Sequence, residues 1–310
     1  MAAIRLRFWG VRGSVPCPGP KTVKCGGNTS CLELRFGEAG RLVVIDAGTG
    51  IRELAAHVMK TDLPKGPVKT QLFLTHTHWD HIMGFPFFVP IFIPTTELDV
   101  YGPVTYEEDT LDKIVGGMLS YRYWPVRLTE LASKIRYYNL KEGTKDLGDG
   151  LWVTTKYLNH PILVLGYRFE FQGKVLCTAY DTEPFQNMFD VPPDSPGYDA
   201  EAFKEGATAA REENEKVSQF FQGADILVHD TQYTHKEYLA GKVGWGHTSF
   251  EQAVNAAQRA GVKRLLLFHH DPDRSDEELE RLERRIRARV AERGSQLQVF
   301  VAREGMEVEV

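Results

Sequence analysis

Four potential metal ligands stand within six residues of one another near the end of the chain's first quarter. The segment QLFLTHTHWDHIMG, residues 71–84, places His76, His78, Asp80 and His81 directly after an apolar run typical of a buried strand. Imidazole and carboxylate groups together bind zinc, manganese and iron. In an extended segment His76 and His78 share one side, whereas Asp80 and His81 diverge from them. The spacing predicts two metals rather than one, and the alternative is a surface loop that is rich in histidine by chance.

Strands must position these candidate ligands, and the apolar pattern of the sequence predicts several strands. Strands are expected at residues 4–8, 31–36, 42–45, 72–74, 151–175 with an interruption at 159–161, 174–179, 225–228 and 262–268. His76, Asp181 and His269 each follow the end of one of these runs. Ligands gathered from several strand ends imply one shared edge of packed sheets.

Helical patterns fall between and after the strands. They are expected over residues 51–59 and 200–221, and two capping boxes predict further helix starts, at Thr248 with Glu251 and at Ser275 with Glu278. Residues 104–150 and 184–222 have the character of elaborations on a basic fold. Because no linker divides the chain, we expect a single domain over residues 1–310.

The composition is that of an ordinary globular protein. The chain has 310 residues, of which 42% are hydrophobic and 25% are charged, so it can bury a large core. Its net charge of −5 gives no general basic signal for nucleic acid. No apolar run approaches the ~18 residues of a membrane span, and the first ten residues lack the apolar segment of a secretory signal. We therefore expect a cytoplasmic protein that does not bind membranes.

The four cysteines offer a second possible metal or redox site. Three of them lie within fifteen residues, but no C-x-x-C pair is present among Cys17, Cys25, Cys31 and Cys177. Structural zinc usually takes four closely spaced ligands. We expect reduced thiols with a structural role.

The HTHWDH segment resembles the H-x-H-x-D-H motif of the metallo-β-lactamase superfamily, whose members are mostly hydrolases with one or two metals. The resemblance implies an α/β fold, an αβ/βα four-layer sandwich of two mixed β-sheets flanked by helices. The segments WGVRGSVPCPGP, GGNTS and DAGTGIREL resemble one subgroup of the superfamily's phosphodiesterase branch. The similarity extends over nearly the whole chain and is weakest at the two elaborations.

The resemblance also implies a complete ligand set. His76, His78 and His160 would hold the first metal. Asp80, His81 and His269 would hold the second, and Asp181 would bridge the two. Zinc is the expected metal, with manganese or iron in its place if zinc is not the native ion. Asp46, after an early strand, either caps the following helix or lies beneath the metals and orients a ligand; we expect the second role.

The reaction class is indicated by residues outside the central motif. Two metals can activate water for attack on phosphorus or on a carbonyl. His247 at a helix start, with Asp230 at the end of the preceding strand, resembles the proposed general acid of the phosphodiesterase branch, although the order is His-Thr-Ser rather than His-Ser-Thr and Asp replaces Glu. His247 and Asp230 are thus expected to be catalytic together with Asp80, and helix capping is the competing role for His247.

These features favour a dinuclear phosphodiesterase that cleaves a small, cyclic phosphodiester, either a cyclic nucleotide or a cyclic ribose phosphate. The branch also contains the transfer-RNA 3′-processing endonucleases, but their long basic arm is not evident here, so RNA is the less favoured partner. The same metals would also serve a thioesterase or lactonase, and a non-catalytic sensor that retains the fold is less favoured still. A homodimer is compatible with the sequence.

Substrate contacts are expected from polar residues near the predicted site. Possible phosphate or sugar contacts are Arg12, Asn28 and Arg122. Residues 121–128, YRYWPVRL, could bind a phosphate-bearing ring, or form a packed lid or a dimer contact.

Overall fold

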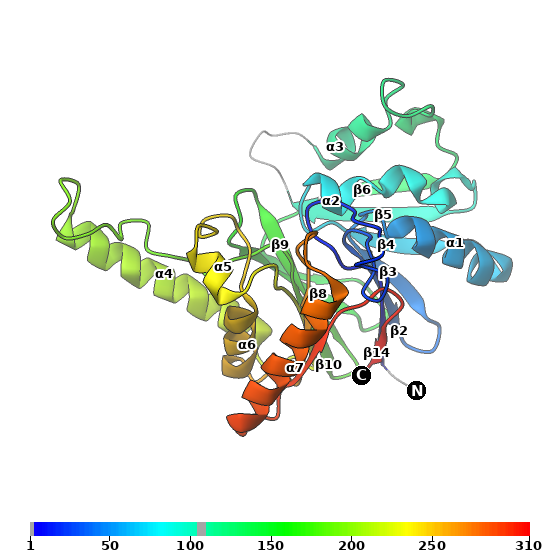
Figure 1. Cartoon of the computed structure of the whole chain (residues 1–310). Coiled ribbons are helices and arrows are strands. Elements are labelled where there is room, and N and C mark those ends of the chain that lie inside the picture. The colour runs from blue at the N-terminus through cyan, green and yellow to red at the C-terminus, as the bar shows by residue number, and fades with distance from the viewer. Residues whose placement is uncertain (1–2, 104–109) are drawn as a thin grey trace.

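Two seven-stranded sheets form the framework of the protein (Figure 1). The computed structural model describes residues 3–103 and 110–310. The first sheet has the order β14-β1-β2-β3-β4-β5-β6 and the second β13-β12-β11-β10-β9-β8-β7. Each sheet is mixed, because β1, β2, β3 and β14 pair antiparallel and β3 to β6 parallel, while β7 to β10 pair antiparallel and β10 to β13 parallel.

The strands have the following bounds. They are β1 (Ile4–Gly10), β2 (Cys31–Phe36), β3 (Arg41–Ile45), β4 (Lys69–Phe73), β5 (Glu97–Pro103), β6 (Lys134–Leu140), β7 (Gly143–Asp146), β8 (Trp152–Leu158), β9 (Val164–Phe171), β10 (Lys174–Ala179), β11 (Ile226–Asp230), β12 (Arg264–Phe268), β13 (Gln298–Val301) and β14 (Glu307–Glu309). The helices are α1 (Ile51–Thr61), α2 (Trp79–Ile82), α3 (Leu111–Met118), α4 (Ala200–Phe221), α5 (His235–Leu239), α6 (Phe250–Arg259) and α7 (Asp276–Glu292).

The core has three layers of side chains. Between the sheets, alternate residues such as Leu6, Phe8 and Phe73 pack against Tyr167 and Phe268 of the second sheet. Helices α1 and α3 cover the outer face of the first sheet, and α4, α6 and α7 cover the outer face of the second. Burial on both faces explains why the central strands read as continuous apolar runs. The expected αβ/βα sandwich of two mixed sheets is confirmed.

The parallel strands bring the candidate ligands to one edge. Strands β3 and β4 run parallel in one sheet, as do β10, β11 and β12 in the other. The carboxyl ends of parallel strands lie at the same edge of a sheet, and ligands of α/β proteins bind there. Strand β4 leads to His76, β10 to Asp181 and β12 to His269.

Most predicted boundaries agree with the structure, and one predicted helix start is wrong. Strands β2 and β10 and helix α4 have the predicted bounds, and Ser275 with Glu278 caps α7 as expected. Helix α6, however, is capped by Ser249 with Gln252, one residue later than predicted. The Thr248 hydroxyl instead donates to the Thr182 carbonyl oxygen, and the N-cap position belongs to Ser249.

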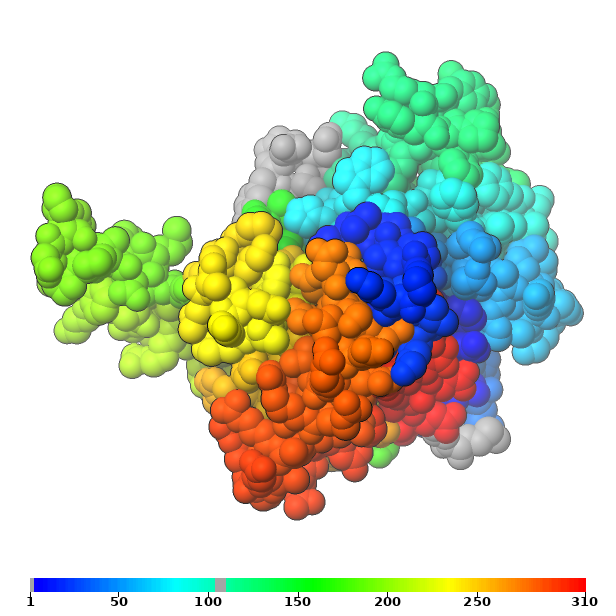
Figure 2. Space-filling view, in the orientation of Figure 1, coloured from blue at the N-terminus to red at the C-terminus, as the bar shows by residue number. Residues whose placement is uncertain are grey.

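The two expected elaborations differ in how they join the fold. Residues 134–146 supply β6 and β7, the edge strands of the two sheets, so within the described chain the first elaboration is confined to residues 110–133; residues 104–109 lie outside the described part. In the second, α4 extends away from the body, and only Phe220 and Phe221 at its end are buried (Figures 1 and 2). No helix in the described ranges is long and apolar enough to cross a membrane.

Candidate metal centre

Two groups of ligand atoms converge at the shared strand edge. The first comprises His76, His78, His160 and Asp181, whose nearest ligand atoms all lie within 4.8 Å of one another. His76 Nε2 is 3.5 Å from Asp181 Oδ2, and His160 Nε2 is 3.2 Å from His78 Nδ1. His76 and Asp181 are buried, whereas His78, the N-cap of α2, and His160 are partly exposed. This group therefore lies on the solvent side of the edge.

The second group is buried throughout and comprises Asp80, His81, His269 and the same Asp181. His81 Nε2 and His269 Nε2 lie 3.3 Å apart, and each is 3.2–3.3 Å from Asp80 Oδ2. Asp181 Oδ1 is 3.2 Å from His81 Nε2 and 3.1 Å from His269 Nε2. The two oxygens of one carboxylate therefore face different groups, Oδ2 the first and Oδ1 the second.

These separations fit a pair of cations. Ligand atoms ~2.1 Å from a tetrahedral zinc ion lie ~3.4 Å from one another, which is the spacing found in both groups. His76 Nε2 and Asp181 Oδ1 are buried and have no hydrogen-bond partner among the residues that the structure describes. Buried polar atoms without partners are costly, and a cation in each group would satisfy one of these two atoms. The His/Asp cluster is therefore suited to a dinuclear metal site.

Metal binding requires neutral imidazoles and ionised carboxylates, and most of these ligands meet the requirement. His81 is the exception, because the carboxylates of Asp181, Asp80 and Asp46 hold its pKa well above the usual value, against the effect of burial. Burial lowers the pKa of His76 well below its usual value and that of His160 to about 4. Burial opposes ionisation of Asp181, but the neighbouring His269 and His81 hold its pKa well below the ordinary range. The pKa of Asp80 is likewise lowered, against the effect of burial, by His81 and His269.

The backbone is strained where it presents these residues. Six described residues other than glycine have positive φ, and Ser14, Asp46, Asp181 and His269, with φ of 64°, 60°, 40° and 59°, belong to this edge. The left-handed region is unfavourable for side chains with a Cβ, and such strain concentrates at functional sites. The strain turns the chain sharply at the ends of β3, β10 and β12, so that the carboxylates and the imidazole point inward.

Asp46 orients His81 rather than capping α1. A carboxylate only accepts hydrogen bonds, so His81 Nδ1–H must donate to Asp46 Oδ2, at 2.7 Å, which directs Nε2 toward Asp181. The Thr75 amide donates to the other oxygen of Asp46 at 2.7 Å, and the Ser30 hydroxyl donates to Oδ2. The N-cap of α1 is Gly50, which rules out the capping role considered for Asp46.

A hydrogen bond from Nδ1 also orients the ring of His160. Its Nδ1–H donates to the Gly246 carbonyl oxygen at 2.9 Å, leaving Nε2 for the first group. Gly246 has φ of 80°, and a Cβ at this position would lie 2.2 Å from His160 Nδ1. Only glycine can therefore supply this carbonyl group to His160.

His247 lies beside both groups. Its ring centroid is 5.3 Å from that of His160 and 5.0 Å from that of His269. Its Nδ1–H donates to Asp230 Oδ2 at 2.9 Å. Burial alone would lower the pKa of His247, but the charge of Asp230, aided by Asp181, raises it to about 9. The raised pKa favours the protonated ring, and Asp230 leaves the Nε2–H of that ring unused.

Asp230 is itself held firmly. The carboxylate is fully buried, and it accepts the Thr182 amide on Oδ2 and the Gln232 amide on Oδ1. These bonds compensate the carboxylate for the loss of water. Asp230 can therefore fix the direction of the His247 ring.

Sequence reasoning missed two positioning residues. The Ser14 amide donates to Asp80 Oδ2 at 2.7 Å, although the composition of the WGVRGS segment indicates only a loop. Glu183 accepts bonds from the amides of Gly244 and Gly246 and from the Tyr238 hydroxyl. Its place two residues after Asp181 is the only signal in the sequence.

The substrate contacts predicted from the sequence have different outcomes. Arg12 is completely buried and donates to the carbonyl oxygens of Gly26 and Arg274 and to Asp276, so we correct its role to a structural one. The Asn28 amide group donates to Glu304, and its oxygen accepts the Thr49 hydroxyl, which commits the side chain to the protein. The role of Arg122, which is exposed, stays a prediction.

Several side chains of residues 121–128 contact one another or neighbouring residues. The Arg127 guanidinium lies 4.2 Å over the Tyr121 ring, and the Tyr121 hydroxyl donates to Glu130. Trp124 packs edge-on against Phe87, with ring centroids 4.8 Å apart. These contacts favour a packed lid for this segment.

The four cysteines are free thiols, as expected, and three are buried.

Two family models match the chain. One, for the metallo-β-lactamase superfamily, covers residues 25–177, and the other, for a β-lactamase superfamily domain, covers residues 205–270. A ribonuclease Z from Lactococcus lactis subsp. cremoris (strain MG1363) is 30% identical over 271 residues, which are 78% of this chain and 83% of the relative.

Solved structures agree on the fold. The metallo-β-lactamase fold protein YhfI from Bacillus subtilis superposes with a TM-score of 0.65 over the whole of both chains, at 16% identity. A diphosphatase from the PhnP family superposes with a TM-score of 0.61 over 99% of this chain and 98% of its own, at 17% identity. Identities this low support the architecture alone.

Proposed function

This chain belongs to the metallo-β-lactamase superfamily and is a metal-dependent hydrolase, and we propose that it is a dinuclear phosphodiesterase that acts on a small, cyclic phosphodiester. The observation that carries the proposal is the His247–Asp230 pair beside the two ligand groups. Carbonyl substrates with good leaving groups do not need such an acid, whereas a phosphodiester expels a poorly stabilised alkoxide.

The ligand assignment follows the two groups. His76, His78 and His160 would hold one metal, and Asp80, His81 and His269 the other. Asp181 would bind both, since each of its oxygens faces one group. Zinc is the metal we propose, because imidazole-rich sites with carboxylates suit it; manganese and iron bind the same ligands.

Each residue has a defined task in this proposal. The bound metals would supply a hydroxide at neutral pH and neutralise the phosphoryl oxygens. Asp46 keeps the His81 ring oriented, and the Ser14 amide does the same for Asp80. His247 protonates the leaving oxygen from Nε2, and Asp230 holds its Nδ1–H and stabilises the cation before transfer.

An RNA 3′-end endonuclease is the second candidate, favoured by the relative named ribonuclease Z. The segment that extends from the body, residues 184–222, contains eight acidic and three basic residues. Such a segment repels a phosphate backbone, and this supports the small substrate. The cytoplasmic location and the homodimer stay predictions from the sequence.

The proposal is tested with a panel of substrates and metal-reconstituted protein. The panel contains 2′,3′- and 3′,5′-cyclic nucleotides, a linear dinucleotide, an aryl phosphodiester, an RNA hairpin with a 3′ extension, one thioester and one lactone. We expect turnover of a cyclic and an aryl phosphodiester. Cleavage of the RNA alone would transfer the proposal to the second candidate, and hydrolysis of the thioester or lactone alone would refute phosphodiesterase activity.

A further inference from the structure

The exposed side chain of Trp245 lies two residues before His247 in the sequence. Trp245 belongs to the loop of residues 241–247 between α5 and α6, and 55% of its surface is exposed. Exposed tryptophans are unusual, because the indole contributes much hydrophobic area when it is buried. The contacts already described at the metal centre use Gly246 and His247 from this loop but leave Trp245 without a task.

The loop is held in place from within. The buried Glu183 carboxylate accepts the Gly244 amide at 3.0 Å on one oxygen and the Gly246 amide at 3.0 Å on the other. The Tyr238 hydroxyl donates to the same carboxylate at 2.8 Å. Because the residues on both sides of Trp245 are anchored, the position of its backbone relative to the metal ligands is fixed.

A cation accompanies the indole. Lys242 Nζ lies 3.6 Å from the centroid of the Trp245 ring and 5.6 Å from that of Tyr233. Tyr233 lies in turn 6.1 Å from the His247 ring, measured between ring centroids, so it connects Lys242 with the proposed acid. Among the residues the structure describes, no carboxylate forms an ion pair with Lys242, and its charge is available to a ligand.

We infer that Trp245 and Lys242 form a leaving-group subsite that binds the aromatic base of a nucleoside whose ribose carries the oxygen protonated by His247. The inference rests on the proposed phosphodiesterase function and selects, between its two substrate classes, the cyclic nucleotide over the cyclic ribose phosphate. The exposed part of the indole stacks on the base, and Lys242 interacts with the polar edge of the base or with a second phosphate. The leaving group of the substrate must lie on the His247 side of the metal centre, because a proton donor must lie next to the leaving group.

The magnitude of the effect follows from base stacking. Stacking one base on an aromatic side chain increases affinity by ~5- to 150-fold. We therefore expect kcat/KM for a 2′,3′-cyclic nucleotide to exceed that for the methyl riboside 2′,3′-cyclic phosphate, which has no base, by a factor in this range.

The test compares these two substrates in matched variants. Trp245→Ala should reduce the preference for the base to near unity and leave kcat/KM for the substrate without a base unchanged. Trp245→Phe, which keeps an aromatic face, should retain most of the preference, and Lys242→Gln should lose part of it. Trp152→Ala is the control, since Trp152 is 44% exposed but begins β8, six residues and ~20 Å before the strand end that leads to His160. An unchanged preference in Trp245→Ala overturns the subsite.

Binding of products separates this inference from the proposed function. The dissociation constants of the two products, a nucleoside 2′- or 3′-monophosphate and the corresponding 2′- or 3′-phosphate of methyl riboside, are measured by calorimetry for the wild type and for Trp245→Ala. Hydrolysis of both cyclic substrates without a base preference would remove the subsite and retain the phosphodiesterase. Tight nucleotide binding that depends on Trp245, without hydrolysis of either substrate, would retain the subsite and remove the phosphodiesterase. Equal binding of both products by the wild type would overturn the subsite directly.

Discussion

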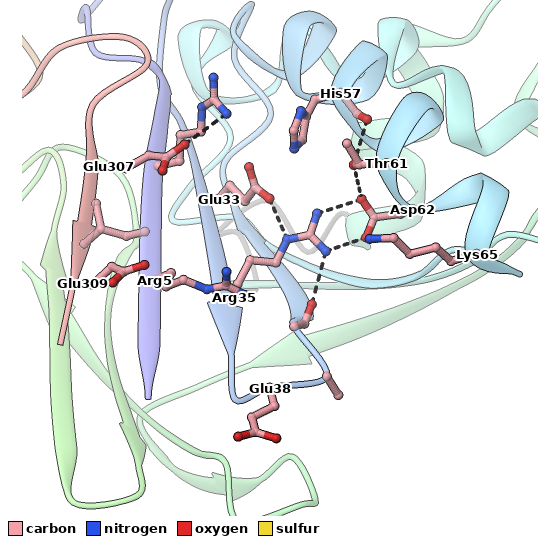
Figure 3. A pocket seen from close by; sticks show the side chains of 14 residues that line it. Arg5, Glu33, Arg35, Glu38, His57, Thr61, Asp62, Lys65, Glu307 and Glu309 are labelled. Carbon is pink, nitrogen blue, oxygen red and sulfur yellow. Dashed lines mark hydrogen bonds and ion pairs between the residues drawn. The ribbon is translucent and has the colours of Figure 1, made fainter. Parts of the chain in front are cut away.

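Two clusters of charged and titratable side chains in this protein have opposite organisation. One is the metal centre, and the other is a pocket of about 340 Å³ on the outer side of the first sheet, beside α1 and the β14 edge (Figure 3). In the pocket, opposite charges face each other: Arg35 pairs with Glu33 and with Asp62, both at 2.6 Å, and Arg7 pairs with Glu307 at 3.1 Å. The charges of Arg35 and Arg7 are therefore balanced within the pocket, although Arg7 Nε has no hydrogen-bond partner among the described residues.

The metal centre lacks this internal compensation. Its imidazole nitrogens and carboxylate oxygens converge at 3.1–3.5 Å, and within the described part of the chain His76 Nε2 and Asp181 Oδ1 have no hydrogen-bond partner. A cation stabilises a cluster of electron-pair donors that are directed at a common point. The comparison shows that a functional site is recognised less by the number of its charged groups than by the absence of complementary partners among them.

Metal removal should distinguish the two clusters most strongly. Chelation should lower turnover of any phosphodiester by more than ~10³-fold, because the hydroxide that a metal provides at neutral pH is lost. Turnover is measured before chelation, after it, and after zinc is restored. If the chelated and dialysed protein kept a tenth of its activity, the metal centre would not be the catalytic site.

Substitution of His247 should have the next largest effect. His247→Ala should lower kcat for a cyclic phosphodiester by ~10²–10⁴-fold, since its alkoxide needs a proton, and should change turnover of an aryl phosphodiester by less than ~10-fold. His235→Ala is the matched control, because His235 is an exposed histidine on α5. Equal losses for both substrates would contradict the role of proton donor.

Much of the metal centre can be predicted because its residues follow apolar strand ends, a short-range pattern. His76, Asp181 and His269 all carry this signal. Arg12 cannot be placed from the sequence, since an arginine in a glycine-rich loop gives no local sign that distant carbonyl groups bury it. Strand β6 resembles an elaboration in the sequence, because its residues are mostly half-buried and do not alternate clearly.

The pH dependence should sharpen the assignment of Asp230. An acid catalyst acts while it is protonated, so activity on a cyclic phosphodiester should be present below the pKa of His247, about 9, and should be lost as the pH rises through it. Asp230→Asn removes the charge that raises this pKa, so the loss should move to lower pH. The profile of kcat against pH is compared in the two proteins. An unchanged pH profile would show that Asp230 does not raise the pKa of the catalytic acid.

The mixed-charge pocket should affect stability alone, and this is the smallest expected effect. Arg35→Met leaves the nearly buried Glu33 and the half-buried Asp62 without their cation and should lower the free energy of unfolding by ~1–3 kcal/mol. Arg5→Met, at an exposed arginine of the same pocket, should change it by less than ~0.5 kcal/mol. Denaturant unfolding measures both, and neither variant should alter turnover. A loss of activity in Arg35→Met would break the comparison.

The most direct test of the account is the metal content of the protein with and without the carboxylate that faces both ligand groups. After reconstitution with zinc and extensive dialysis, the wild type should retain two equivalents per chain by mass spectrometry. Asp181→Ala should fold but retain one equivalent or fewer, because each metal loses a ligand, whereas Arg35→Met should retain two. Two tightly held equivalents in Asp181→Ala, or fewer than one in the wild type, would contradict a dinuclear centre bridged by Asp181.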